Sequence, residues 1–180
     1  QKTAYEIKEC DWSSDVCSSD LESLRSSWDH CSAIVREAEL RGFDSVLLPS
    51  GYELGLDTVA MASALARDTH RIRLLTAIRT GENWPPQLAR QIATLQHLSS
   101  DRIDINIISS DLAGQTMASA PRYQRTLNVM TALDELLRGE SSEWDTPDFS
   151  FRATPPRIAS GDRKSTRLNS SHIPLSRMPS

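Results

Sequence analysis

The sequence has no long apolar segment. Its apolar runs, such as residues 46–48, are only a few residues long, whereas a helix that crosses a bilayer needs about 20. The amino terminus also lacks the charged region followed by an apolar stretch that a secretory signal requires. We therefore expect no association with a membrane. The expected location is the cytoplasm.

Positively charged residues are also fewer than negatively charged ones. The 180 residues include 20 Lys and Arg against 24 Asp and Glu, which gives a net charge of −4. Such a chain creates no general field that attracts polyanions, so nucleic acid is not an expected partner. Hydrophobic residues make up 38% of the chain, and the seven Gly and nine Pro are ordinary numbers. This composition excludes collagen-like structure and wholesale disorder, and it permits a packed core.

Several motifs that carry chemistry are missing. Cys10, Cys17 and Cys31 cannot all pair, and their spacing fits neither a zinc knuckle nor a redox C-x-x-C. The four histidines occur singly, so we expect no bound metal. The sequence contains no G-x-G-x-x-G, no P-loop and no G-x-S-x-G, which argues against the usual phosphate cradles and a serine hydrolase.

The two ends of the chain differ in character from its middle. Residues 1–22 are acidic and residues 159–180 are basic, and neither stretch has an apolar period. The strings DWSSDVCSSDL at 11–21 and RKSTRLNSSHIPLSRMPS at 163–180 resemble translated sequencing-adapter DNA. Genuine low-complexity tails are the alternative. We predict non-native tails at 1–22 and 159–180, and one domain over 23–158.

The middle alternates helical and strand patterns. The strands begin about 25–32 residues apart, which is the length of a βα unit, so the sequence predicts an α/β fold with a parallel sheet. The expected order is helix 27–41, strand 45–48, helix 56–67, strand 71–78, helix 86–99, strand 103–108, helix 121–138 and a hairpin over 143–151.

The apolar periods also predict which faces are buried. Cys31, Ile34, Val35 and Ala38 recur at helical spacing, and Gly42 stands where a helix ends with positive φ. In the strand over 103–108, isoleucines alternate with polar residues, so one face should meet apolar packing and the other a polar environment.

Two further expectations concern the later helix and the third strand. The last helix is expected to bury its leucine and methionine stripe, and the dipeptide before the third strand is expected to be a solvated entry. The residues are Leu127, Met130, Leu133 and Leu137 for the stripe, and Asp101 and Arg102 for the entry.

Polar residues follow each predicted strand. In parallel sheets ligands bind at the carboxyl ends of strands, so these positions are the candidate site. With the polar Asn106 they offer hydroxyls, an amide and a guanidinium, which suit a polar heterocycle or an anion; the alternative is that each is a loop residue pairing with local backbone. They are Ser50, Gly51, Tyr52, Arg79, Thr80, Gly81, Ser109, Ser110 and Asp111.

Three segments together carry a family resemblance. They are GFDSVLLPSG at 42–51, LLTAIRTGENWPPQLARQIATLQHLSSDRIDINIISSD at 74–111 and RYQRTLNVMTALDELLRGE at 122–140. In order and spacing they resemble the luciferase-like flavin-dependent monooxygenases, and within that family the alkanesulfonate monooxygenase branch.

The resemblance implies a (β/α)₈ TIM barrel, which needs about 250 residues, so residues 23–158 would be an incomplete barrel of about three strands. It implies that reduced FMN binds at the carboxyl ends of the strands and that O₂ and FMN together oxygenate a small organic substrate, an alkanesulfonate or related organosulfur compound. It also implies a separate NAD(P)H-dependent flavin reductase as partner and a homo-oligomeric parent protein.

Five positions match residues that bind the cofactor in the family. The resemblance assigns flavin contacts to Ser50, Arg79, Asn106, Ser109 and Tyr123. It places the main FMN-phosphate site and the catalytic residues in strands beyond 158, so no catalytic residue is assigned here. Two positions depart from the pattern: Ser119 replaces a family histidine, and Leu54 stands where the sulfonate branch has a cysteine.

Two alternatives stay open at this point. The chain could be a catalytically inactive piece that binds no cofactor, since an open three-stranded sheet leaves edges and apolar faces uncovered. It could instead belong to a related oxidoreductase that uses the deazaflavin F420.

Overall fold

The computed structural model describes residues 27–52, 55–157 and 168–169. The predicted tails at 1–22 and 159–180 lie outside these ranges, apart from residues 168–169, and so does Leu54. In the part that is described, no helix is both long enough and apolar enough to cross a membrane.

The predicted elements are present in the predicted order. The boundaries of β1 and β3 are as expected, and the others differ from the expected ones by at most two residues, because helix and strand ends depend on capping contacts. The helices are α1 (Trp28–Leu40), α2 (Thr58–Asp68), α3 (Pro85–Ser99) and α4 (Ser119–Arg138), and the strands are β1 (Ser45–Leu48), β2 (Arg73–Arg79), β3 (Ile103–Ile108), β4 (Ser142–Asp145), β5 (Ser150–Ala153) and β6 (Leu168–Asn169).

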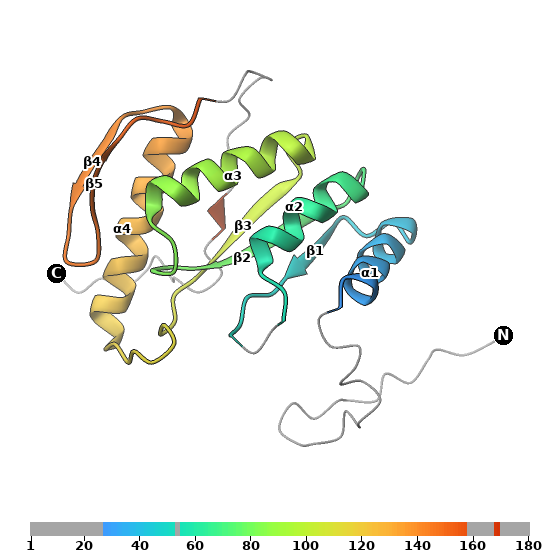
Figure 1. The fold of residues 1–180 in the computed structure, drawn as a ribbon, viewed down its shortest axis with the longest axis horizontal. Helices are drawn as coiled ribbons and strands as arrows, with labels where there is room; N and C mark the ends of the chain where they lie inside the picture. Colours follow the sequence, from blue (N-terminus) through green and yellow to red (C-terminus); the bar gives the residue numbers. More distant parts are fainter. Residues whose placement is uncertain (1–26, 53–54, 158–167, 170–180) are drawn as a thin grey trace.

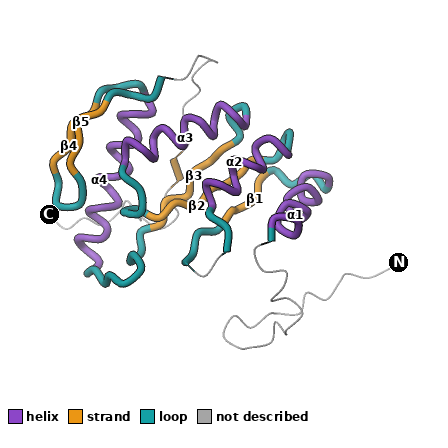
Figure 2. The backbone as a smooth tube through the Cα atoms, viewed as in Figure 1, coloured by secondary structure: helices purple, strands orange, loops and turns teal. Residues whose placement is uncertain are grey.

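The main sheet is parallel, as the sequence predicted. Its strand order is β1-β2-β3-β6, and β4 and β5 form a separate antiparallel hairpin. Figure 1 shows α2 and α3 lying side by side over one face of the sheet, with the hairpin alongside α4. The tube in Figure 2 shows how each of these helices connects one strand to the next. This is the βα arrangement that brings the carboxyl ends of β1, β2 and β3 to one edge.

The core lies between the sheet and its helices. On the face of β3 that meets the helices, Ile103, Ile105 and Ile107 are buried. Asp104 and Asn106 are half-buried on the opposite face, which we call the second face of the sheet. The predicted alternation of β3 is therefore confirmed. Leu47 of β1 is 50% exposed, so β1 contributes less to the core than the two strands beside it.

Capping residues fix the ends of the first helix. The Ser27 side chain accepts a hydrogen bond from the His30 backbone N–H at the start of α1. Past the other end, Gly42 has φ of +80°, which confirms the predicted left-handed position.

Two predicted helix faces were partly wrong. Ile34 of α1 is 51% exposed and borders an apolar hollow of about 200 Å³ beside β1, while its neighbour Val35 is buried. In α4, the predicted Leu133 is buried and Met130 and Leu137 are partly buried against the core, but Leu127 is 37% exposed. Both helices carry apolar residues on more than one side, so contacts with the sheet select the buried side. The buried residues of α4 are Arg125, Thr126, Val129, Ala132, Leu133 and Leu136.

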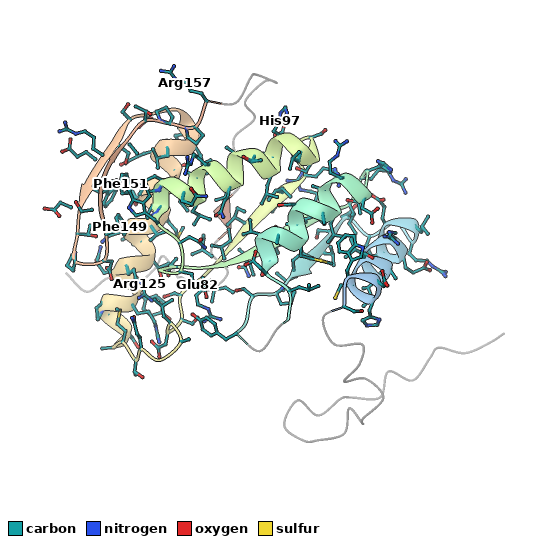
Figure 3. All side chains as sticks on the ribbon, viewed as in Figure 1. Glu82, His97, Arg125, Phe149, Phe151 and Arg157 are labelled. Carbon is teal, nitrogen blue, oxygen red and sulfur yellow. The ribbon has the colours of Figure 1, made fainter. Side chains whose placement is uncertain are left out.

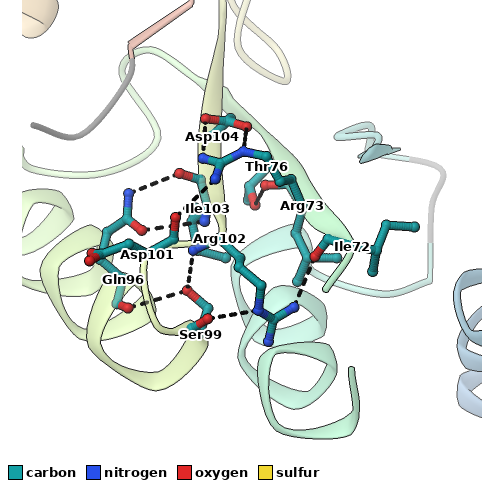
Figure 4. Close-up of polar contacts among 10 residues, drawn as sticks. Ile72, Arg73, Thr76, Gln96, Ser99, Asp101, Arg102, Ile103 and Asp104 are labelled. Atoms are coloured by element: carbon teal, nitrogen blue, oxygen red, sulfur yellow. Dashed lines mark hydrogen bonds and ion pairs between the residues drawn. The ribbon is translucent and has the colours of Figure 1, made fainter. Parts of the chain in front are cut away.

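Arg102 was expected to be solvated, and this was also wrong. Its guanidinium lies at the ends of α2 and α3 and donates to the carbonyl oxygens of Ser99, Ile72, Ala66 and Thr69 and to the Thr69 hydroxyl, at 2.8–2.9 Å. Figure 4 shows its contacts with Ser99 and Ile72. Burial lowers the pKa of Arg102 below its ordinary value. The side chain therefore ties the ends of α2 and α3 to the start of β2.

An ion pair joins the same ends of β2 and β3 on the second face. Arg73 donates from Nε and Nη2 to the two carboxylate oxygens of Asp104, at 2.6 and 2.7 Å. The hydrogen bond with Asp104 raises the pKa of Arg73. Two arginines, Arg73 and Arg102, thus fix the amino-terminal ends of these strands. The candidate site lies at the opposite, carboxyl ends.

The hairpin is attached to α4 and α3 by aromatic and polar contacts. The Glu135 carboxylate of α4 accepts from the Ser142 hydroxyl at 2.6 Å and from the Trp144 indole at 2.9 Å. The Phe151 ring meets Trp84, which precedes α3, edge to face at 6.0 Å. The predicted hairpin is confirmed, and it covers the side of the helix layer.

Candidate functional site

Arg79, the last residue of β2, is the centre of the polar groups at the carboxyl edge. Its Nη1 donates to the Ser110 hydroxyl and to the Asp111 carbonyl oxygen, the latter at 3.3 Å, and its Nη2 donates to the Ser50 carbonyl oxygen at 3.5 Å. The side chain is only 12% exposed. One guanidinium thus connects the loops that follow β1, β2 and β3.

Two further side chains flank this guanidinium. The Arg79 Cζ atom lies 4.8 Å from the ring centroid of Tyr52, which follows β1 and is 53% exposed. Glu82 Oε1 lies 3.3 Å from Arg79 Nε, although this contact lacks the geometry of a hydrogen bond. A carboxylate and an aromatic face therefore hold the Arg79 side chain in place.

Helix α4 adds two arginines to the same edge. Arg122 Nη1 lies 3.3 Å from Asp111 Oδ1, an oxygen that also accepts from the Met117 backbone N–H at 3.1 Å. Arg125 is only 4% exposed and donates from Nη2 to the Ser110 carbonyl oxygen at 3.2 Å. We refer to Arg79, Arg122 and Arg125 as the arginine cluster.

A hydroxyl pair fixes α4 to the end of β2. The hydroxyls of Thr80 and Thr126 lie 2.9 Å apart, and both residues are buried. The Thr80 backbone N–H also donates to the Ile108 carbonyl oxygen at 3.1 Å, which extends the ladder between β2 and β3. These contacts set the position from which Arg122 and Arg125 reach the loops.

Polar atoms without partners gather at this edge. Among the described residues, five buried side-chain nitrogen or oxygen atoms have no hydrogen-bond partner. Four of them are the Nε atoms of the three clustered arginines and the Ser109 hydroxyl oxygen; the fifth, in Gln91, belongs to α3. A buried polar atom without a partner carries a desolvation cost. The gathering of four such atoms at one edge therefore marks the place where a polar ligand fits best.

Comparison with known proteins identifies the family. The family model described as luciferase-like monooxygenase matches residues 13–173. The chain belongs to the luciferase-like monooxygenase family. The resemblance seen in the sequence is thereby confirmed at the level of the family.

Individual relatives of this luciferase-like chain include enzymes named for organosulfur substrates. A sulfoquinovose monooxygenase from Novosphingobium aromaticivorans is 47% identical over 161 residues, covering 82% of this chain and 44% of that protein. An FMNH₂-dependent dimethylsulfone monooxygenase from Pseudomonas fluorescens is 28% identical over 136 residues, covering 71% of this chain and 37% of that protein. The chain thus spans less than half the length of these relatives.

Solved structures share the fold. The EDTA monooxygenase from Chelativorans sp. BNC1 superposes with a TM-score of 0.64 at 17% identity, covering 76% of this chain and 43% of that one. This likeness confirms the predicted α/β architecture of a luciferase-like monooxygenase, present here in part.

The structure places the five predicted flavin residues unequally. Ser50 and Arg79 are in contact through the Ser50 carbonyl oxygen, and the buried hydroxyl of Ser109 belongs to the residue before Ser110, which binds Arg79. Asn106 lies two residues before the end of β3, on the same face of the sheet as Arg79. Tyr123 is 42% exposed, with the Arg122 guanidinium 5.7 Å from its ring. The fold therefore gathers four of them near one edge and connects Tyr123 to it through Arg122.

Sequence reasoning missed Arg125 and Glu82. Glu82 lies three residues after Arg79 in a loop, and its role depends on how that loop folds back. Arg125 stands four residues before Val129 and seven before Ala132, so it continues the stripe that α4 buries. The helical spacing of Arg125 to buried residues could have predicted its burial. The prediction that Leu127 belonged to the buried stripe placed Arg125 outside that stripe.

Gly81 allows the close approach of Arg125. Its φ is +99°, and a Cβ there would lie 3.2 Å from Arg125 Cζ and Nε and from Leu112 Cδ1. We expect Gly81→Ala to lower the free energy of unfolding by about 2 kcal/mol, measured by urea unfolding, because it combines backbone strain at positive φ with a tight contact that Arg125 and Leu112 must shift to relieve.

Gly114→Ala is the matched control for that substitution. Gly114 has φ of +74°, but a Cβ there would meet nothing within 4 Å. We expect it to cost about 1 kcal/mol from the backbone alone. Equal losses for the two variants would contradict a specific packing role for Gly81 against Arg125.

Proposed function

We propose that the chain is part of an FMNH₂-dependent monooxygenase that uses O₂ to oxygenate a small organosulfur compound, an alkanesulfonate or a related sulfonate. The observation that carries this proposal is the 47% identity to a sulfoquinovose monooxygenase, since sulfoquinovose is a sugar that carries a sulfonate group. The name of the dimethylsulfone relative supports reduced FMN as the cofactor rather than F420.

The polar groups at the carboxyl edge fit FMN. The buried Ser109 hydroxyl has no partner within the described part of the chain, and flavin ring atoms or the ribityl chain would supply one. We propose that Ser50, Arg79, Asn106 and Ser109 bind and orient the cofactor, and that Tyr123 contacts it from α4. FMN, when bound, supplies the reaction with oxygen, and the protein holds it against the substrate and excludes water.

Further parts of the proposal concern the whole protein. Because the chain spans 44% of the sulfoquinovose relative, we propose that the whole protein is a (β/α)₈ barrel whose other strands complete the site. We also propose a homo-oligomer, a cytoplasmic location and a partner NAD(P)H-dependent flavin reductase. For the whole protein with that reductase, we expect sulfite to be released from sulfoquinovose only when both reductase and O₂ are present.

Titration of reduced FMN into the purified chain, without oxygen, tests the cofactor site. We expect saturable quenching of tryptophan fluorescence, and we expect Arg79→Gln to weaken binding about tenfold because one charged hydrogen-bond donor is lost. Arg152→Gln is the control, because Arg152 is 80% exposed and, within the described residues, pairs only with Glu143 on the hairpin.

Two results would contradict the proposal. A chain with native circular dichroism and no saturable binding of reduced FMN would favour the inactive alternative. Tighter binding of F420 than of FMN would favour the deazaflavin alternative.

A further inference from the structure

The arginine cluster contains one more positive charge than the carboxylates that the described part of the chain places around it. Glu82 lies 3.3 Å from Arg79, and Asp111 lies 3.3 Å from Arg122. Arg125 has no carboxylate partner among the described residues, and its one hydrogen bond is to a backbone carbonyl oxygen. Among the described residues, three guanidiniums and two carboxylates leave a net charge of +1 at this edge.

An enclosed charge of this kind is costly unless an anion accompanies it. Arg125 is 4% exposed, so water solvates its guanidinium poorly. The charge also lies where ligands of parallel α/β sheets bind, beside the carboxyl ends of β2 and β3 (Figure 3, where Arg125 and Glu82 are labelled). An anionic group of the ligand would therefore neutralise the cluster.

The cluster also has donors that an incoming anion can reach. The side chains of Arg122 and Asp111 are 21% and 38% exposed, so their ion pair lies at the surface of the cluster. A guanidinium has five N–H donors, and within the described residues Arg122 uses one of them, on Asp111. A planar fork of this kind matches the oxygens of a sulfonate or a phosphate.

We propose that Arg122 and Arg125 of the arginine cluster hold the sulfonate group of the substrate: Arg122 donates hydrogen bonds to it directly, and the buried Arg125 guanidinium supplies the balancing positive charge. A sulfonate is a monoanion, so it matches the net charge of +1, whereas a phosphate dianion would leave an excess negative charge. The inference rests on the proposed function, since it assigns the substrate group to a place in that site. It concerns Arg122 and Arg125, which carry no flavin role above.

The test uses the anion alone, so it is independent of flavin. Methanesulfonate is titrated into the purified chain at constant ionic strength by isothermal calorimetry, with inorganic phosphate and the neutral dimethylsulfone as parallel probes. We expect saturable binding of methanesulfonate, weaker binding of phosphate and none of dimethylsulfone. Arg122→Gln should weaken methanesulfonate binding about tenfold, because a charge-assisted hydrogen bond is lost.

Arg138→Gln is the matched control on the same helix. Arg138 pairs with Asp134, is 67% exposed, and lies at the other end of α4, so its loss should leave the affinity unchanged. Equal affinity of Arg122→Gln and the parent chain, equal losses in both variants, or tighter binding of phosphate than of methanesulfonate would overturn the inference. Failure of the proposed function would instead appear as methanesulfonate binding without binding of reduced FMN.

Discussion

Arg102→Met is expected to lower the free energy of unfolding by about 3–4 kcal/mol, which is a large share of the stability of a small domain. The guanidinium donates to four carbonyl oxygens and one hydroxyl, and methionine fills part of its volume without donating to any of them. The carbonyl oxygens at the ends of α2 and α3 would then be left partly buried without donors. Urea unfolding followed by circular dichroism measures the loss.

Two further variants make this expectation specific. Arg102→Lys keeps the charge but loses the planar fork, so it should cost about 2 kcal/mol and remain folded if the methionine variant does not. Arg41→Met removes an arginine that is 73% exposed and whose side chain pairs, in the part of the chain that is described, only with Glu37 of α1, and it should cost no more than about 0.5 kcal/mol. A loss for Arg102→Met as small as that for Arg41→Met would show that Arg102 does not join these elements.

Glu39→Gln is expected to lower the free energy of unfolding by about 1–2 kcal/mol at pH 7, after allowance for solvent screening. Glu39 Oε1 accepts from the backbone N–H groups of His70, Arg71 and Ile72, at 2.9, 2.5 and 2.9 Å. These bonds attach the end of α1 to the segment that enters β2. A glutamine oxygen can still accept, but it carries no charge.

The same carboxylate makes stability depend on pH. Partial burial raises the pKa of Glu39, but the three backbone donors outweigh it and hold the pKa at about 2, below the ordinary 4.5. Because the folded pKa is the lower one, the stabilisation is complete above pH 4.5 and is lost as the pH falls from 4.5 towards 2. The difference in the free energy of unfolding between the parent chain and Glu39→Gln should therefore shrink from pH 7 to pH 4 and again to pH 3.

Glu37→Gln is the control for this effect. Glu37 is 55% exposed and pairs with Arg41 on the surface of the same helix, so its loss should cost no more than about 0.5 kcal/mol at any pH. A difference between the parent chain and Glu39→Gln that does not shrink with acid would contradict the assignment of the pH dependence to Glu39.

Local pattern was enough to predict the elements of this fold. The alternation in β3, the βα spacing and the glycine after α1 each depend on residues close together in sequence, and the structure has all three. The positions that follow the strands could also be predicted as a candidate site, because parallel strands bring their carboxyl ends to one edge whatever the details of packing.

Long-range contacts decided what local pattern could not. Arg102 looks like a surface residue in sequence, yet its partner Ala66 is 36 residues away and its environment exists only after α2 and α3 pack on the sheet. Arg125 is similar, because it becomes part of the site only where α4 meets the loops after β2 and β3. The sequence by itself determined the family and the order of βα units, since both depend on side-chain identity and period. The tertiary structure alone decided which charges are buried together, because burial depends on segments distant in the chain.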